Sequence, residues 1–292
     1  MSGAGATPPV TRVGVVGCGV MGAGLAEVCA TPGREVLVAV TSQRSLTAGR
    51  ARLTGSLDRA VAKGRLTGQD RDGILGRVAF TQHLADLADR DLVIEAVSED
   101  EQTKLKLFGE LDGIVRDPDA VLASNTSSLP VAKLAMATAR PQRVIGMHFF
   151  NPVPTLALVE LTGSLLSEES ALARAERFVR EALGKEVIRS RDRAGFVVNG
   201  LLVPYLLSAI RMLESGHACA EDIDKGMVLG CAHPMGPLRL ADLIGLDTLA
   251  AVAAGLYEET KEQLFSAPAL LSRMVESGLY GKKNGRGFYS YR

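Results

Sequence analysis

The sequence has no excess of charge of either sign and no long apolar run. Lysine plus arginine number 33, as do aspartate plus glutamate, so the formal net charge is zero at pH 7. Bulk charge therefore gives no argument for nucleic-acid or membrane binding. No apolar stretch approaches the ~20 residues of a membrane span. The first ten residues, MSGAGATPPV, lack a basic region and an apolar segment, so we expect a loose tail and no signal peptide.

Cysteine is also scarce. The four cysteines, Cys18, Cys29, Cys219 and Cys231, have neither the spacing of a metal site nor that of a disulfide framework. We therefore expect free thiols in a cytoplasmic protein without a resident metal. The chain of 292 residues, 47% of them hydrophobic and 23% charged, is typical of a soluble globular protein with one large or two ordinary domains.

Short apolar strands alternate with helical segments over the first two thirds of the chain. Strands are expected at residues 13–17, 36–40, 92–97, 120–124 and 143–148. A charged helical excursion, long enough for two helices, runs from about 45 to 77. The alternation predicts a doubly wound, mostly parallel α/β sheet over residues 1–190. Helical patterns at 196–214, 220–229 and 248–263 predict an all-helical second domain over residues 191–292.

A glycine-rich loop follows the first strand and opens a helix. It consists of Gly17, Gly19, Val20, Met21 and Gly22, in the pattern G-x-G-x-x-G. The first glycine permits a tight turn, the second lets a pyrophosphate approach the backbone, and the third lets helix and strand pack closely. The helix N-terminus also favours phosphate. This context predicts a dinucleotide site, and the alternative is a purely structural turn.

The second strand lacks the acidic residue that usually ends it in such folds. Asp or Glu there holds the ribose hydroxyls of NAD, whereas Val40 takes that place here. Thr41 and Ser42 supply hydroxyl groups, and Arg44 supplies a guanidinium that suits a phosphate. We therefore favour NADP slightly over NAD. The alternative is that Arg44 points to solvent and NAD binds more weakly.

Polar residues gather where the later strands end, which is the edge where open α/β sheets bind ligands. They are Glu99 and Lys104 after the third strand, Ser124, Asn125 and Ser127 after the fourth, and His148 and Asn151 after the fifth. Glu160 follows in the apolar run LALVELTG, where a carboxylate is costly unless it is paired. A histidine is its natural partner, because a carboxylate fixes the tautomer. The alternative is that these residues are structural. His148 would then be a hydrogen-bonded histidine at a strand end, Glu160 would anchor a loop, and a polar residue of SNTSS would cap the helix that follows.

Seven motifs, in order over nearly the whole chain, resemble those of the 3-hydroxyacyl-CoA dehydrogenases, including the bacterial 3-hydroxybutyryl-CoA dehydrogenases. They are GCGVMGAG, LVIEAVSED, LASNTSSL, GMHFFNPVP, GFVVN, HPMGPLRLADLIGLDT and GKKNGRGFY. The resemblance implies a Rossmann-like first domain, a helical second domain that dimerises, and an active site in the cleft between them. It also implies hydride transfer between a nicotinamide and C3 of a 3-hydroxyacyl thioester.

The resemblance also implies roles for individual residues. His148 would be the general base for the 3-hydroxyl, and Glu160 would orient it and stabilise the imidazolium. Ser127 and Asn199 would hydrogen-bond the reacting oxygen, where charge develops in the transition state. Positions near the cofactor are matched by Glu99, Lys104, Asn125, Asn151 and Lys283.

Two further positions are matched in the helical excursion. Ser56 and Lys63 correspond to residues that contact CoA, and their separation of two helical turns puts both on one side of a helix. The alternative for Lys63 is an ordinary solvated lysine. The run GFVVNGLLVPYLLSAIRML carries more apolar surface than one amphipathic face needs, so we expect a homodimer through the second domain.

The chain departs from the family pattern at Val40, and also at Ala157, Ala194 and Gly200, where lysine, proline and arginine are usual. No departure removes a catalytic group, but together they leave the cofactor and the acyl carrier open. An acyl carrier protein, as in extender-unit biosynthesis, offers the same phosphopantetheine arm as CoA. A sugar-acid dehydrogenase is less favoured because that relative lacks the full HFFNPVP pattern. The intact set of catalytic residues argues against an inactive binding or structural homologue.

Overall fold

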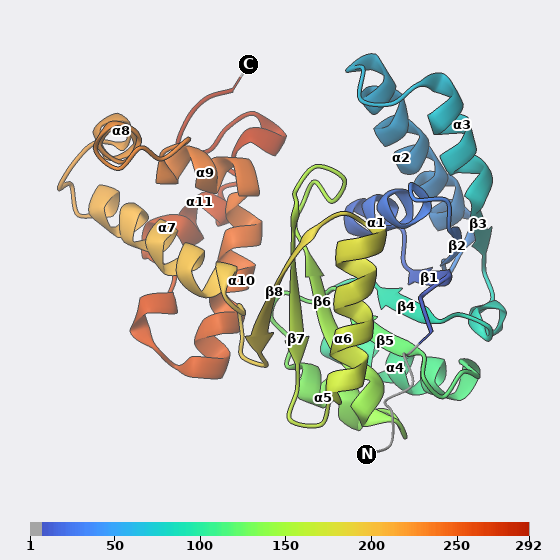
Figure 1. Cartoon of the computed structure of the whole chain (residues 1–292). Coiled ribbons are helices and arrows are strands. Elements are labelled where there is room, and N and C mark those ends of the chain that lie inside the picture. Colours follow the sequence, from blue (N-terminus) through green and yellow to red (C-terminus); the bar gives the residue numbers. More distant parts are fainter. Residues whose placement is uncertain (1–7, 292) are drawn as a thin grey trace. The chain divides into compact units, whose positions relative to one another are not determined.

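The computed structural model describes residues 8–291, and the chain divides after Asp192 into two compact units (Figure 1). The first unit holds a sheet and its covering helices, and the second is built from helices. Most of the tail expected at residues 1–10 lies outside the described residues. Among the described residues no single helix has the length and hydropathy of a membrane span, although the bent helix pair Pro237–Ile244 and Leu246–Thr260 passes that test together.

The first unit is built on an eight-stranded sheet with the order β3-β2-β1-β4-β5-β6-β7-β8. Its strands are β1 Arg12–Val16, β2 Glu35–Ala39, β3 Val78–Thr81, β4 Leu92–Glu95, β5 Val121–Ser124, β6 Val144–Phe149, β7 Leu158–Gly163 and β8 Glu186–Arg191. All neighbours are parallel except β6 and β7. The predicted fold class is confirmed. The edge strands β3 and β8 were not anticipated, since one is very short and the other alternates with charged residues.

Helices cover both faces of this sheet (Figure 1). They are α1 Val20–Ala30, α2 Gln43–Ala62, α3 Gly68–Arg77, α4 Glu101–Ile114, α5 Val131–Met136 and α6 Glu169–Arg177. Apolar residues of α1 and α6 pack in one core cluster and those of α4 and α5 in another. Because both faces are covered, the central strands are apolar on both sides, which explains runs such as VGVV and LVIEAV.

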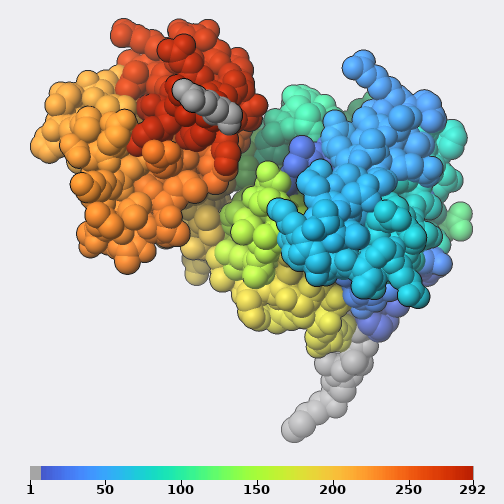
Figure 2. Space-filling model, turned by 90° about the horizontal axis from the view of Figure 1, so that it is seen from above, coloured from blue at the N-terminus to red at the C-terminus, as the bar shows by residue number. Residues whose placement is uncertain are grey.

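The expected helical excursion is the pair α2 and α3, whose surface is blue to cyan in Figure 2. Helix α2 begins after Ser42, whose side chain accepts a hydrogen bond from the N–H of Ser45. Helix α3 begins with a capping box, in which Thr67 and Asp70 satisfy each other's backbone N–H groups. Leu53 and Leu57 of α2 are buried against the core of the unit.

The second unit contains five α-helices in the part of the chain that is described. They are α7 Val198–Glu214, α8 Ala220–Gly230, α9 Pro237–Ile244, α10 Leu246–Thr260 and α11 Ala269–Glu276. Asp242 is fully buried and accepts hydrogen bonds from the N–H groups of Phe288 and Tyr289 and from the hydroxyl of Tyr291. A side chain on Gly281 or Gly287 would collide with Asp242, so the glycines of GKKNGRGFY serve this packing.

Candidate active site

His148 and Glu160 are directly opposite residues in the antiparallel pair of β6 and β7. Nδ1 of His148 lies 2.8 Å from Oε2 of Glu160. The carboxylate is fully buried and the histidine is 7% exposed. A buried carboxylate at this distance accepts Nδ1–H and fixes the tautomer that leaves Nε2 for proton transfer. The ring of Phe150 packs against the imidazole with a centroid distance of 4.5 Å.

The SNTSS loop after β5 is held beside this pair by hydrogen bonds to two glutamates. Ser124 donates to Glu95 over 2.6 Å, and the hydroxyls of Thr126 and Ser128 donate to Glu99. The Ser127 N–H also donates to Glu99.

Asn125 and Ser127 have different roles in this loop. The Asn125 side chain accepts the N–H of Phe149, which joins the loop to the end of β6. Within residues 8–291 the hydroxyl of Ser127 makes no hydrogen bond, so the loop presents it as a donor while the backbone is fixed. Asn151, two residues after β6, is exposed.

Lys104 is the cation that balances both glutamates. It is 1% exposed, and its Nζ lies 3.1 Å from Glu95 and 2.6 Å from Glu99. Burial of Glu99 opposes its ionisation, but the charge of Lys104 and hydrogen bonds from Lys104, Thr126 and Ser127 together lower its pKa. Glu99 and Lys104, which sequence reasoning placed near the cofactor, therefore hold the SNTSS loop. Glu95 was missed, although a carboxylate in the apolar strand LVIEAV gave the same signal as Glu160.

The glycine loop fits a dinucleotide. Gly17 has φ of 92°, and a Cβ there would lie 2.6 Å from the carbonyl oxygen of Ala96. A Cβ on Gly22 would collide with the carbonyl oxygen of Gly17. A Cβ on Gly19 would meet no described atom within 4 Å, so packing does not require that glycine, and the space fits a pyrophosphate. Helix α1 begins without a side-chain cap or an acidic first turn, which favours an anion. Val20 and Met21 form its first residues.

The residues at the end of β2 that sequence reasoning placed near the ribose differ in their exposure to solvent. Val40 is 7% exposed and belongs to the apolar core. Ser42 caps α2, and Thr41 and Arg44 are exposed. Val40 therefore stands where an acid is usual in such folds, and it supplies no carboxylate at the end of β2.

Ser56 and Lys63 lie at different depths along α2. Ser56 is half-buried near Glu27 of α1, a carboxylate that is 4% exposed. Burial raises the pKa of Glu27, and the Ser56 hydroxyl and the charges of Arg65 and Arg59 oppose this effect. Lys63 is exposed and follows the last residue of α2 as its C-cap.

Asn199 and Lys283 belong to the second unit. Asn199 is half-buried in the first turn of α7. Lys283 forms an ion pair with Asp247. Among the described residues no cluster of three or more His, Cys, Asp or Glu side chains has the arrangement of a metal site.

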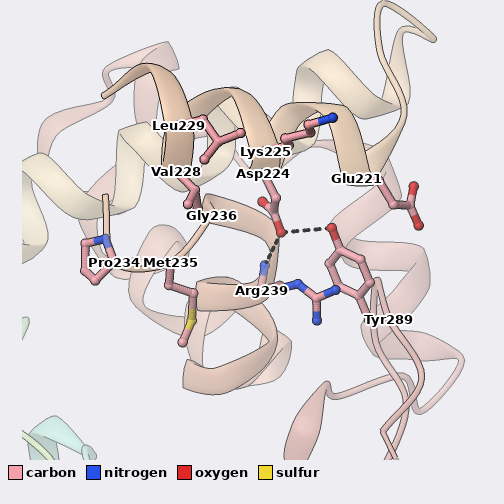
Figure 3. Close-up of a pocket in the computed structure, with 10 residues that line it drawn as sticks. All are labelled: Glu221, Asp224, Lys225, Val228, Leu229, Pro234, Met235, Gly236, Arg239 and Tyr289. Atoms are coloured by element: carbon pink, nitrogen blue, oxygen red, sulfur yellow. Dashed lines mark hydrogen bonds between the residues drawn. The ribbon is translucent and has the colours of Figure 1, made fainter. Parts of the chain in front are cut away.

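The second unit also has an open pocket of about 460 Å³ between α8, α9 and the C-terminal segment (Figure 3). Asp224 accepts the N–H groups of Leu238 and Arg239 at the start of α9 and the hydroxyl of Tyr289. The guanidinium of Arg239 lies 4.0 Å from the Tyr289 ring centroid. Asp224 and Arg239 are thus engaged in joining α8, α9 and the C-terminal segment.

Fold and site together define a dinucleotide-dependent oxidoreductase with a buried histidine–carboxylate pair. The NAD binding domain of 3-hydroxyacyl-CoA dehydrogenases matches residues 12–193, and their C-terminal domain matches residues 195–291. The chain therefore belongs to the 3-hydroxyacyl-CoA dehydrogenase family, as its motifs predicted, and a nicotinamide is its cofactor.

Individual relatives are similar over nearly their whole length. A 3-hydroxybutyryl-CoA dehydrogenase of Mycobacterium tuberculosis is 59% identical over 97% of this chain and 99% of that protein. The crystal structure of FadB2 from M. tuberculosis has a TM-score of 0.96 at 58% identity, over 98% of this chain and 100% of that one. The structure of (S)-3-hydroxybutyryl-CoA dehydrogenase from Ralstonia eutropha has a TM-score of 0.91 at 43% identity, over 97% and 99%.

Replacing Lys104 with methionine should destabilise the first unit strongly. The change leaves Glu95, which is fully buried, without its counter-charge, and breaking a buried pair in this way costs about 3–5 kcal/mol. The control is Lys106→Met on the same helix, where an exposed pair with Glu110 is removed and less than about 1 kcal/mol is expected. Thermal unfolding measures both. Equal midpoints for the two variants would contradict a buried role for Lys104.

The same comparison has a predicted pH dependence. Because the pKa of folded Glu99 is lowered, its contribution to stability is present above its unfolded pKa and is lost as the pH falls through the folded value. The difference between wild type and Lys104→Met should therefore narrow in acid. A difference that grows as the pH falls would be inconsistent with the Glu99–Lys104 pair.

Proposed function

We propose that the protein interconverts a short-chain 3-hydroxyacyl-CoA and its 3-ketoacyl-CoA, with 3-hydroxybutyryl-CoA and acetoacetyl-CoA as the substrate pair. The observation that carries this proposal is the buried contact of 2.8 Å between His148 and Glu160. Two of the relatives above are named for 3-hydroxybutyryl-CoA, which supports the acyl length and the carrier.

In the direction of oxidation, His148 accepts the proton of the 3-hydroxyl at Nε2. Glu160 holds Nδ1–H and stabilises the imidazolium that forms. Ser127 donates a hydrogen bond to the reacting oxygen, which stabilises the charge that develops there. When bound, the nicotinamide supplies the hydride acceptor. In the direction of reduction, the imidazolium of His148 returns the proton to the same oxygen.

Binding of the thioester arm is assigned to α2. Ser56 is half-buried on this helix, and Lys63, its C-cap, offers an exposed cation to the phosphates of CoA. NADP(H) is the favoured cofactor, because Val40 removes both the acceptor for a ribose hydroxyl and the repulsion of a 2′-phosphate. Thr41, Ser42 and Arg44 supply donors at the same strand end.

One assay tests both the acyl carrier and the cofactor. Acetoacetyl-CoA and an acetoacetyl carrier protein are offered side by side, each with NADH and with NADPH, and kcat/KM is measured. We expect turnover of the CoA thioester and roughly a 10- to 100-fold preference for NADPH, since one charge-assisted hydrogen bond differs. Turnover of neither thioester would refute the proposed function. A preference for the acetoacetyl carrier protein would instead indicate that the substrate is carried by an acyl carrier protein, as in extender-unit biosynthesis.

Substitution of His148 by glutamine should abolish most turnover with little change in cofactor affinity. Only proton transfer is lost, and general acid–base catalysis typically contributes ~10²–10⁴-fold. Steady-state kcat for acetoacetyl-CoA reduction and fluorescence titration of the reduced cofactor give the two quantities. His83→Gln, at an exposed histidine before a 3₁₀ turn, is the matched control. Retention of more than about a third of wild-type kcat would exclude His148 as the base.

We also propose a homodimer formed through the second unit. Leu201 of α7 and Leu229 of α8 are each 73% exposed, and the run GFVVNGLLVPYLLSAIRML carries more apolar surface than one amphipathic face needs, which supports a partner at this unit. Light scattering at micromolar concentration should give twice the mass of one chain. Leu201→Glu should weaken the dimer, whereas Leu165→Glu in the first unit, where the leucine is fully exposed to solvent, should not. An active wild-type monomer would refute the dimer.

A further inference from the structure

Helix α2 lies unusually close to the glycine loop. A Cβ on Gly49 would lie 2.6 Å from Sγ of Cys18, so only a glycine allows this approach. Cys18 is buried in the contact, and burial raises the pKa of its thiol to about 11 while the charge of Arg52 opposes that effect. The Cys18 thiol is therefore neutral, and it packs between the glycine loop and α2. The contact fixes α2 against the turn that holds the cofactor.

Arg52 follows Gly49 by one helical turn and contacts the same loop. Its guanidinium donates a hydrogen bond of 3.2 Å to the carbonyl oxygen of Cys18. The side chain is exposed, and within residues 8–291 no carboxylate lies within 4.0 Å of it. A guanidinium has five N–H donors in a planar fork. Within residues 8–291 Arg52 thus has no ion-pair partner and keeps unused donors at the glycine loop.

This place is next to the end of β2. The N–H of Gly17 donates to the carbonyl oxygen of Ala39, the last residue of β2, over 2.9 Å. Cys18, which Arg52 contacts, directly follows Gly17, and Val40 directly follows Ala39. In dinucleotide-binding folds, a carboxylate at this corner holds the hydroxyls of the adenosine ribose. Here Val40 stands where that carboxylate is usual, and Arg52 contacts the adjoining glycine loop.

Other arginines of α2 have different surroundings. Arg50 lies 5.3 Å from the ring centroid of Phe80 in β3. Arg44, in the first turn, is exposed and makes no hydrogen bond within the described part of the chain. Arg52 is the arginine of this helix that a hydrogen bond fixes to the loop, so less side-chain freedom is lost when it binds a ligand.

We propose that Arg52 is the specificity-determining residue for the cofactor and binds the 2′-phosphate on the adenosine ribose of NADP(H). The proposal rests on the proposed dehydrogenase function only in that the glycine loop holds a dinucleotide. Arg44 acts at most as a secondary, solvent-exposed contact. The hydrogen bond to Cys18 aims the fork, and the remaining donors bind the phosphate oxygens in the charge-assisted manner typical of arginine.

Calorimetric titration with cofactor fragments tests this without any turnover. ADP-ribose and 2′-phospho-ADP-ribose share the pyrophosphate and differ only in the 2′-phosphate. Arg52→Met should weaken binding of 2′-phospho-ADP-ribose about 10-fold or more and change the Kd of ADP-ribose less than about twofold. Arg50→Met, on the same helix and stacked on Phe80, is the matched control and should change neither. Arg52→Lys should recover part of the loss, because it keeps the charge without the fork.

Two results would overturn the proposal. Equal weakening of both fragments by Arg52→Met would make Arg52 a pyrophosphate ligand, and no weakening of either would make it a surface residue. Unchanged thermal midpoints of the variants show that the fold is intact. Failure of the dehydrogenase proposal is seen separately, as absence of acetoacetyl thioester reduction by the wild-type protein with either coenzyme.

Discussion

The register of the antiparallel pair β6 and β7 places His148 opposite Glu160, and the chemistry of the site depends on this pairing. Side chains alternate between the two faces of a strand, so a slip by one residue would turn Glu160 away from the imidazole. The apolar neighbours Val159 and Leu161 are fully buried on the other face and oppose such a slip. Burial makes an unpaired ionised carboxylate costly. The same burial therefore favours the register in which Glu160 contacts His148.

A second buried network supports the same edge of the sheet. Lys104 reaches from α4 to the two carboxylates Glu95 and Glu99, which in turn hold the loop after β5 by its hydroxyls and N–H groups. The charged and polar residues at this edge therefore have two different roles. Glu95, Glu99 and Lys104 pair with one another and position Ser127, whereas Glu160 orients His148 so that its imidazole is available for proton transfer.

Local patterns in the sequence were sufficient for the doubly wound sheet, the glycine loop and the His148–Glu160 hypothesis. Each depends on features close in the chain: a strand–turn–helix sequence, or an acid in an apolar strand shortly after a histidine. Glu95 gave the same local signal, but its ion pair with Lys104 was not predicted, because sequence does not show which way a side chain on the next helix turns. Arg52 gave no signal, since its contact with Cys18 spans 34 residues and depends on close packing at Gly49.

Val40 stands where a dinucleotide-binding fold usually has an acid, and this changes the charge at the end of β2. The valine is buried in the apolar core, so the strand end presents no charge of its own. The guanidinium of Arg52 is held at the glycine loop by its hydrogen bond to the carbonyl oxygen of Cys18. On the two proposals above, α2 carries the cofactor-selecting Arg52 and the CoA-contacting Ser56, and Lys63 follows as its C-cap, so one helix would contribute to both nucleotide-containing ligands.

The claim that His148 and Glu160 act as one unit is tested most directly by a double-mutant cycle. His148→Gln, Glu160→Gln and the double variant are compared by kcat/KM for acetoacetyl-CoA reduction with the preferred coenzyme. Residues that act as a unit give strongly non-additive losses. The account predicts that the double variant is within about threefold of His148→Gln alone, because Glu160 acts only through the imidazole. Losses that multiply, as for two independent groups, would contradict it.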